Sequence, residues 1–300
     1  MLTSMRLDGV LPPIPTPFDD GGRVDAAAMS ANVARWMATR IRGVVVLGSN
    51  GEAPLLDEAE SDAAIAAARE QVPPDRLCIA GTGRESTPAA IGAARRAADL
   101  GADAVLVRTP SYFKPLLTPE AFVAHYTAVA DASPAPVVLY NFTALTGVTL
   151  AVDVVARLAE HPNVVGMKES GSDLTYLSAL IDATPDDFAV MAGSAPVFCP
   201  ALVMGAAGGV LAVASVATDL CTDLYDAVRA GRLDEARVLQ RRLTPIARLV
   251  TSAHGIPGLK AAVTMLGFTA GDPRPPLRPA GPAAIEQLRT ALESLRAPVA

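Results

Sequence analysis

The feature that most constrains the fold is a repeated alternation between short apolar runs and alanine-rich amphipathic stretches. The apolar runs begin at Gly9, Gly43, Leu77, Ala104, Pro136, Val164, Ala189 and Gly208, with helical stretches between them such as 25–39, 57–71, 87–100 and 119–132. Strands that are apolar on both faces and alternate with helices are typical of a parallel sheet buried on both sides. About eight such pairs predict a closed (β/α)8 TIM barrel rather than an open, doubly wound sheet. No G-x-G-x-x-G motif follows the first run, which weakens a dinucleotide-binding alternative.

The pattern changes after residue 215, because only helical periodicity follows. Helices are predicted over 217–231, 234–252, 256–267 and 282–295. The first of them completes the last strand–helix pair, and the others form an appendage. No low-complexity linker separates the two parts. We therefore predict a barrel over residues 1–231 and a C-terminal helical extension over 232–300 that packs on it.

The composition suits one large core and argues against charged macromolecular partners. The 300 residues are 51% hydrophobic and 19% charged, so disorder is not expected. A net charge of −6 argues against nucleic acid or an anionic membrane surface as a partner. The cysteines Cys78, Cys199 and Cys221 lack close spacing, so neither a disulfide framework nor a zinc site is indicated. We expect reduced core cysteines in a cytoplasmic protein.

Two segments resemble targeting or membrane-spanning sequences only superficially. Residues 1–18 lack the apolar core and the cleavage site of a signal peptide. Residues 188–218 contain no charge, but Gly and Pro residues divide them into pieces too short to cross a bilayer. We expect a strand, a helix and a second strand there, inside a large core.

Candidate site residues come from the predicted strand ends, because active sites of such barrels lie where the strands meet their C-terminal loops. These positions carry mainly hydroxyls and amides: Thr16, Ser49, Asn50, Thr82, Thr109, Tyr112, Tyr140, Asn141, Lys168, Ser170, Ser194 and Ser215. Lys168 is the single amine among them, and the only acids close by are Glu52 and Glu169. No cluster of histidines and carboxylates is present, so we predict that the site uses no metal.

Lys168 ends a run, NVVGMKES, that otherwise has the pattern of a buried strand. Alternation along a strand places Lys168 on the same face as Val164 and Gly166. Val165 and Met167 then lie on the opposite face. If the first face lines the barrel interior, Gly166 leaves space beside the amine, and the scarcity of water favours the neutral form. A neutral amine can form a Schiff base with a ketone; the alternative is that Lys168 lies beyond the strand end and extends to water.

Two neighbouring features fit a reaction on a carboxylated ketone. Tyr140 ends the preceding predicted strand, and a phenol beside an amine can transfer protons as a carbinolamine becomes an imine. The turn GSNGE, residues 48–52, presents backbone N–H groups together with Ser49 and Asn50, which suits a carboxylate. Taken singly, an amphipathic core tyrosine and an ordinary strand-to-helix turn also explain these features.

Together, these motifs resemble the dihydrodipicolinate synthase/N-acetylneuraminate lyase family of class I, Schiff-base-forming pyruvate enzymes. The resemblance spans the chain and rests on PPIPTPF, GSNGE, AGTGRES, TPSYFKP, LYNFTALTG, GMKES, AGSA and GIPGLK. It implies that Lys168 forms the imine and Tyr140 transfers protons, without a cofactor. It also implies that Tyr112 reaches a neighbouring subunit's site in a homotetramer. The positions it implies for substrate binding are Ser49, Asn50, Ser170, Gly193 and Leu211.

The resemblance leaves the second substrate open. Synthases of the lysine pathway carry an arginine for aspartate semialdehyde where this chain has Leu145, and Thr-Thr in place of Ser49 and Asn50. Several motifs are most similar to 4-hydroxy-2-oxoglutarate aldolase, although Thr143 stands where that group usually has proline. We therefore expect cleavage of a 4-hydroxy-2-oxo acid to pyruvate and an aldehyde such as glyoxylate.

Other activities would use the same residues. They are 4-hydroxy-tetrahydrodipicolinate (dihydrodipicolinate) synthase, N-acetylneuraminate lyase, and an aldolase or dehydratase of 2-keto-3-deoxy sugar acids. A non-catalytic pyruvate sensor belongs to a different class. The intact set of Lys168, Tyr140 and Tyr112 argues against a sensor.

Overall fold

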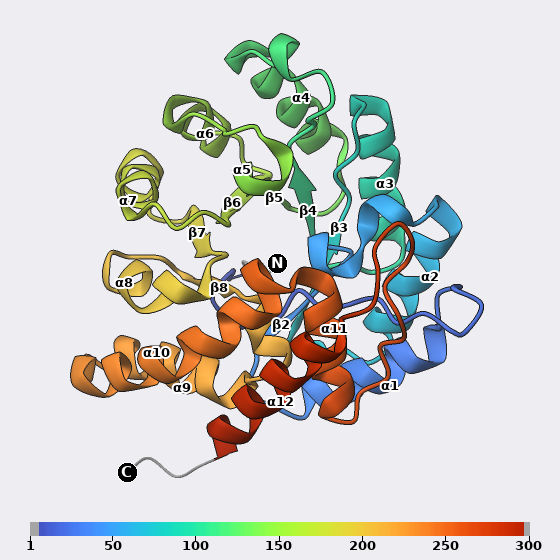
Figure 1. Ribbon diagram of the computed structural model, residues 1–300. Helices are drawn as coiled ribbons and strands as arrows, with labels where there is room; N and C mark the ends of the chain where they lie inside the picture. The colour runs from blue at the N-terminus through green and yellow to red at the C-terminus, as the bar shows by residue number, and fades with distance from the viewer. Residues whose placement is uncertain (1–5, 297–300) are drawn as a thin grey trace.

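Eight parallel strands form the centre of the computed structural model, which describes residues 6–296 (Figure 1). They are hydrogen-bonded in the order β1-β8-β7-β6-β5-β4-β3-β2. Their bounds are β1 (Gly9–Leu11), β2 (Gly43–Val46), β3 (Leu77–Gly81), β4 (Ala104–Arg108), β5 (Val137–Asn141), β6 (Val164–Glu169), β7 (Ala189–Ala192) and β8 (Gly208–Val210). The predicted (β/α)8 barrel is confirmed.

The barrel closes through the proline-rich segment that follows β1. Pro12 and Pro13 have no N–H to donate, so β1 ends at Leu11 although the apolar run continues. The segment still contacts β2, because Val45 N–H donates to Pro12 O at 2.9 Å and Ile14 N–H donates to Val45 O at 3.0 Å. The first strand is therefore shorter than expected. These two hydrogen bonds complete the cylinder together with a third, which Arg42 N–H donates to Val10 O of β1 at 2.9 Å.

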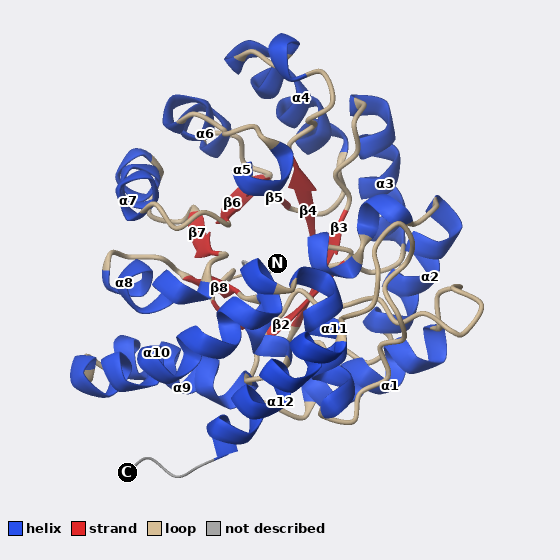
Figure 2. Ribbon diagram, viewed as in Figure 1, coloured by secondary structure: helices blue, strands red, loops and turns tan. Residues whose placement is uncertain are grey.

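Helices follow the strands and form a ring around them (Figure 2). They are α1 (Ala26–Met37), α2 (Glu58–Arg69), α3 (Thr87–Asp99), α4 (Pro119–Ala132), α5 (Thr143–Thr146), α6 (Val152–Ala159), α7 (Leu174–Ala183), α8 (Phe198–Val203) and α9 (Thr218–Arg229). Several begin after a side chain that accepts an N–H of the first turn, namely Asp25, Asp57, Ser86, Thr118 and Asp173. Each cap stabilises its helix by about 1 kcal/mol and defines where the preceding loop ends.

The uncharged segment 188–218 forms a strand, a helix and a strand, as predicted. These are β7, α8 and β8. The last strand was predicted to extend to Ser215, but it ends at Val210, and Ala212–Ser215 forms a 3-10 turn that leads into α9. A short apolar run does not distinguish strand from helix by periodicity alone. Within residues 6–296, no helix combines the length and the apolar character needed to cross a membrane.

Two apolar cores surround the strands. The inner core fills the barrel with side chains such as Leu11, Val45, Ile79, Leu106 and Val138. The outer core lies between the strands and the helices and contains Cys78, Cys199 and Cys221, which form no disulfide. Burial raises the pKa of the Cys78 thiol to about 12. The inner core ends near the carboxyl ends of the strands, where polar side chains begin.

The C-terminal helices lie together against one side of the barrel (Figure 1). They are α10 (Leu233–Arg248), the π-helical turn Leu249–Ala253, α11 (Gly255–Met265) and α12 (Pro282–Arg296). The proposed boundary at residue 231 falls between α9 and α10. Asn32 of α1 anchors this part, because its Nδ2 donates to Thr269 O at 2.6 Å and its Oδ1 accepts the Thr269 N–H at 3.1 Å.

Candidate active site

Lys168 and Tyr140 lie side by side on the inner face of the barrel, near the carboxyl ends of β5 and β6. They are direct partners in the strand register. Their side chains are buried, with residue exposures of 3% for Lys168 and 4% for Tyr140. The Lys168 Nζ lies 4.2 Å from the centroid of the Tyr140 ring. The structure therefore places the amine beside the phenol and not in bulk water.

A β-bulge in β6 changes the predicted pattern of faces. The register with β5 shifts by one position, so Val165 is an extra residue. Val164 packs in the outer core with Met167, while Val165 packs against the inner core. The prediction that Val164 shares a face with Lys168 is therefore wrong. Gly166 does not open space beside the amine either, since a Cβ there would lie 2.4 Å from a backbone oxygen of β7.

The turn after β2 brings Ser49 to the same mouth of the barrel. Ser49–Gly51 forms a 3-10 turn, and Ser49 Oγ shares a hydrogen bond of 3.1 Å with Tyr140 Oη. Thr16 Oγ1 supports this turn by donating to Gly51 O at 2.7 Å. Asn50 lies on the same turn and is partly exposed. A hydroxyl, a phenol and an amine thus follow one another across the mouth.

Ser170 and Gly193 meet where β6 and β7 end. A Cβ at position 193 would lie 2.2 Å from Ser170 Oγ, so only glycine leaves room for the serine hydroxyl. The Gly193 N–H donates to Glu169 O at 2.6 Å, which continues the strand pairing past the end of β7. Both residues therefore border the mouth next to Lys168.

Two other candidate residues, Tyr112 and Leu211, lie away from Lys168, Tyr140 and Ser49 of the same chain. Tyr112 is 79% exposed, and its ring packs against that of Phe113 with centroids 5.0 Å apart. Leu211 is buried, and its side chain lies in the outer core between strands and helices. Neither side chain approaches the Tyr140–Lys168 pair.

A buried hydrogen bond directly behind the pair was missed from the sequence. Asn141 and Glu169 directly follow Tyr140 and Lys168 in the chain and are also register partners. Asn141 Nδ2 donates to Glu169 Oε2 at 2.6 Å. Burial raises the pKa of Glu169, and the hydrogen bonds from Asn141 and the Gly171 N–H offset this only in part. The bond fastens the ends of β5 and β6 to each other at the level of the amine. The sequence contained one indication of this bond: Asn141 directly follows Tyr140, and Glu169 directly follows Lys168.

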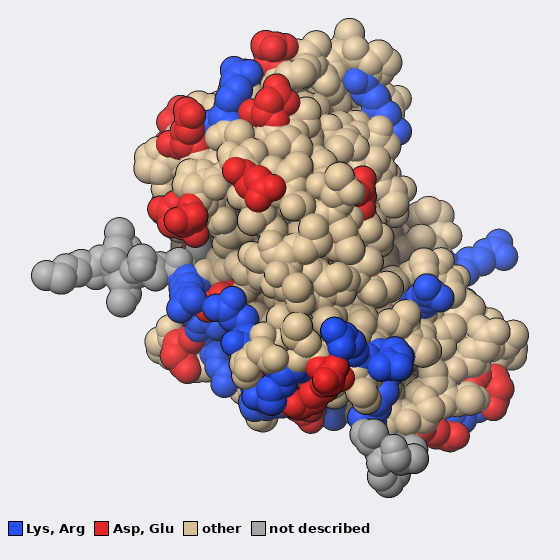
Figure 3. Space-filling model, turned by 90° about the vertical axis from the view of Figure 1, so that its left-hand side faces the viewer, with Lys and Arg blue, Asp and Glu red and all other residues tan. Residues whose placement is uncertain are grey.

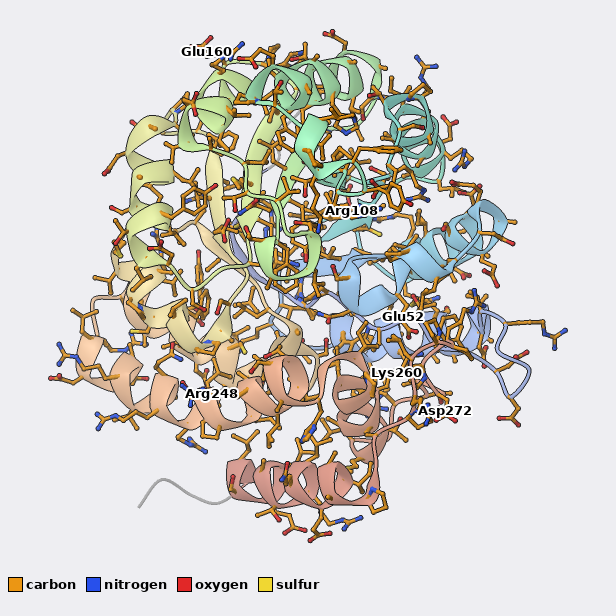
Figure 4. All side chains as sticks on the ribbon, turned by 45° about the horizontal axis from the view of Figure 1, so that its top comes forward. Glu52, Arg108, Glu160, Arg248, Lys260 and Asp272 are labelled. Carbon is orange, nitrogen blue, oxygen red and sulfur yellow. The ribbon has the colours of Figure 1, made fainter. Side chains whose placement is uncertain are left out.

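The C-terminal extension anchors the Ser49 turn through a buried ion pair. Glu52 ends the turn with a left-handed φ of 57°. Its carboxylate lies 2.7 Å from the Nζ of Lys260 on α11, and the two side chains are 0% and 2% exposed. Lys260 Nζ also donates to Asp272 O at 3.0 Å, and Glu52 Oε2 accepts the Arg274 N–H at 2.8 Å. Figure 4 shows Glu52, Lys260 and Asp272 gathered where the turn meets the C-terminal helices.

Burial lowers the pKa of Lys260, and the neighbouring Glu52 carboxylate counteracts this shift. Sequence reasoning noted Glu52 only as a nearby acid and did not connect it with Lys260.

Arg108, the last residue of β4, was also missed as a candidate. It follows Leu106 by two positions and therefore faces the barrel interior.

An inward-facing lysine beside a tyrosine, at the carboxyl end of a (β/α)8 barrel, is the arrangement that a class I, Schiff-base-forming lyase requires. The chain belongs to the Dihydrodipicolinate synthetase family, whose model matches residues 6–295. It is an enzyme of the carbon–carbon lyase class, among the pyruvate-dependent aldolases.

Known proteins are similar to this chain over nearly its whole length. It is 36% identical over 293 residues to 4-hydroxy-tetrahydrodipicolinate synthase of Methanopyrus kandleri, which covers 97% of each chain. Dihydrodipicolinate synthase DapA-2 from Bacillus anthracis matches the structure with a TM-score of 0.92 and 31% identity, covering 97% of this chain and 99% of that one. A prophage protein of the dihydrodipicolinic acid synthase family from E. coli K12, in complex with pyruvate, matches with a TM-score of 0.91 and 26% identity, covering 97% and 99%.

These relatives bear on the expected substrate. The curated relative carries the name of the synthase, not of 4-hydroxy-2-oxoglutarate aldolase. The synthase was the alternative in the sequence analysis, and it fits these comparisons better than the main expectation does.

Proposed function

We propose that this enzyme forms or breaks a carbon–carbon bond between pyruvate and an aldehyde through a Schiff base on Lys168. The observation that carries the proposal is the buried amine 4.2 Å from the centre of the Tyr140 ring. The hydrogen bond between the Tyr140 and Ser49 hydroxyls connects this pair to the turn that suits a carboxylate. The pyruvate complex of the prophage relative supports the choice of 2-oxo acid.

Each residue has a role in this mechanism. The Lys168 amine attacks C2 of pyruvate, and the carbinolamine loses water to become an imine. Tyr140 donates the proton that this water needs and recovers one through its bond to Ser49. N–H groups of the Ser49–Asn50 turn hold the pyruvyl carboxylate. The Tyr140–Ser49 pair takes up a C3 proton, which gives an enamine. C3 of the enamine attacks the aldehyde carbon, and the same pair returns the proton to the aldehyde oxygen. Hydrolysis of the resulting imine restores the amine.

The first candidate for the second substrate is aspartate semialdehyde. This assignment rests on the name of the curated relative, 4-hydroxy-tetrahydrodipicolinate synthase. A second candidate is the reverse type of reaction, cleavage of 4-hydroxy-2-oxoglutarate to pyruvate and glyoxylate. It is favoured by Leu145, an apolar side chain that is 65% exposed where the resemblance places the carboxylate-binding arginine of the synthases.

Tyr112 is proposed to act in the site of a neighbouring subunit of a homotetramer. It lies on an exposed apolar loop with Phe113 and Leu116. This loop contacts the one that follows β5, because a Cβ at Gly147 would lie 2.6 Å from Lys114 Nζ. A site that is completed by a neighbouring subunit needs an exposed side chain within an apolar contact surface, and Tyr112 beside the mouth of the barrel has these properties.

A second apolar surface supports the same assembly. Val203 and Met204 at the end of α8, and Val238 of α10, are exposed. Figure 3 shows a wide area without charged side chains on the face that carries α7 and α8. Exposed apolar patches on folded chains commonly mark protein contacts. Sedimentation analysis of the purified enzyme measures whether the chain assembles.

Reduction with borohydride in the presence of pyruvate tests the mechanism. We expect irreversible inactivation and one reduced pyruvyl group on the peptide that contains Lys168. Buried Lys260 serves as an internal control, because its ion pair with Glu52 keeps it from reacting. Labelling of another lysine, or of none, contradicts the proposal. Pyruvate consumption with aspartate semialdehyde, compared with pyruvate release from 4-hydroxy-2-oxoglutarate, then distinguishes the two candidate substrates.

A further inference from the structure

Arg108 lies on the inner face of the barrel in the same layer as the reactive pair. It is the register partner of Tyr140, which is in turn the partner of Lys168. Neighbouring strands are about 4.8 Å apart, so the backbones of Arg108 and Lys168 are separated by roughly 10 Å. The side chains of Lys168 and Arg108 shorten this gap from both sides. A short dicarboxylic 2-oxo acid that is bound to Lys168 as an imine can then reach Arg108 with its distal carboxylate. Figure 4 marks Arg108 at the end of β4.

Among the residues that the structure describes, the guanidinium group of Arg108 is held through a single nitrogen. Nη1 donates to Glu85 Oε1 at 2.7 Å and to its neighbour's carbonyl, Thr109 O, at 3.1 Å. Nε and Nη2 make no hydrogen bond within residues 6–296. These two N–H groups form one fork on the same edge of the planar group. Such a fork matches the two oxygens of a carboxylate.

Glu85 holds the guanidinium without using that fork. Its other oxygen, Oε2, accepts the backbone N–H groups of Ser111 at 2.9 Å and Tyr112 at 3.0 Å. Burial acts to raise the pKa of Glu85, but the hydrogen bonds from Ser111, Arg108 and Tyr112 outweigh it and leave the pKa below its ordinary value. Glu85 therefore stays ionised near neutral pH and keeps Nη1 in place. The unused edge of Arg108 has a defined direction.

A small cavity brings Arg108 together with two of the residues of the proposed reaction, Ser49 and Tyr140. Ser49, Tyr140 and Arg108 all line it, and its volume is about 20 Å³. This is room for about one water-sized group, such as a single carboxylate oxygen. Gly83 admits the arginine stem, since a Cβ there would lie 2.5 Å from Arg108 Cγ.

We propose that Arg108 binds the distal carboxylate of the second substrate and thereby selects carboxylated aldehydes and 2-oxo diacids. This inference rests on the proposed function, because the imine on Lys168 holds the other end of the substrate. Both candidate substrates carry such a carboxylate. Leu145 offers no cation for it, and Arg108 supplies one from β4. Arg108 is then a specificity-determining residue.

Two 2-oxo acids of equal chain length test this role without knowledge of the physiological aldehyde. 2-Oxoglutarate has a distal carboxylate, and 2-oxopentanoate has none. For each acid, the concentration that gives half-maximal labelling of Lys168 by borohydride is measured. We expect Arg108→Leu to raise this concentration for 2-oxoglutarate by about tenfold or more, because a charge-assisted hydrogen bond is lost. The value for 2-oxopentanoate should change by less than about twofold. Arg108→Lys should recover part of the preference.

Arg84→Leu is a matched control at the same rim. It removes the same charge, but the Arg84 guanidinium pairs with Glu58 at 3.0 Å and does not line the cavity. The preference for 2-oxoglutarate should survive in this variant. The inference is overturned if the wild type does not distinguish the two acids, or if Arg108→Leu weakens both equally. The same labelling experiment is also run with pyruvate. Failure of pyruvate to label Lys168 overturns the proposed function itself, so this outcome is distinguished from a failure of the Arg108 inference alone.

Discussion

Glu52 and Lys260 form a buried ion pair at 2.7 Å that joins the turn carrying Ser49 to the C-terminal helix α11. Both charges are removed from water, so each depends on the other and on the hydrogen bonds with Arg274 and Asp272. Tyr140 depends on the same turn through its bond to Ser49. The C-terminal extension therefore supports the geometry of the candidate active site from outside the barrel.

Lys260→Met should reduce the free energy of unfolding by about 3–5 kcal/mol, because it leaves the Glu52 carboxylate buried without its partner. The double variant Glu52→Gln/Lys260→Met should recover most of that loss. Urea unfolding measures both changes. Arg40→Met, which breaks exposed ion pairs with Asp223 and Asp226, should cost less than about 1 kcal/mol. A Lys260→Met variant as stable as the wild type would show that the pair does not matter.

Lys168→Met should abolish turnover and borohydride labelling while leaving the fold intact. Methionine fills a similar volume and removes an amine whose burial is unfavourable for folding. We therefore expect an unfolding midpoint equal to or above that of the wild type, together with a complete loss of pyruvate-dependent activity. Circular dichroism and the activity assay are run on the same preparation. Substantial residual turnover would remove Lys168 from the mechanism.

Tyr140→Phe should lower kcat by about 10²–10⁴-fold, since it deletes the group proposed to transfer protons and keeps the ring. Labelling of Lys168 should persist at a reduced rate, because the amine remains. Tyr126→Phe is the matched control: its hydroxyl is also buried, and it donates to Val107 O at 3.3 Å outside the site. That variant should lose about 1 kcal/mol of stability and keep its kcat. Equal activity losses in the two variants would contradict the role of Tyr140.

Glu169→Gln should reveal a pH-dependent cost of burying the Glu169 carboxylate. Its pKa is raised in the folded state, so the folded enzyme binds the proton more tightly than the unfolded chain does. The stability contributed by this proton is present below the unfolded value of about 4.3 and is lost as the pH rises through the folded value. The stability of the wild type relative to Glu169→Gln should therefore fall between acidic and neutral pH. Unfolding midpoints at several pH values measure it, and a relative stability that grows with pH would refute the direction.

Several elements could be predicted from local pattern alone. The helix predicted over 119–132 has the bounds observed for α4, because a threonine cap precedes a proline and a regular apolar face. The identity of Lys168 and Tyr140 as neighbours followed from their positions at consecutive strand ends. The faces of β6 were predicted in part wrongly, since the bulge at Val165 depends on pairing with β5 and not on β6 itself.

The sequence by itself determined the eightfold alternation, the buried strands and the chemical types of the groups at their ends. These depend on periodicity and side-chain chemistry, which are local properties. Only the tertiary structure decided that Arg108 pairs with Tyr140 in the strand register, that Asn141 donates to Glu169, and that Lys260 forms an ion pair with Glu52. Such contacts arise from strand register and from the packing of segments distant in the chain, and a single sequence has no local pattern that encodes them.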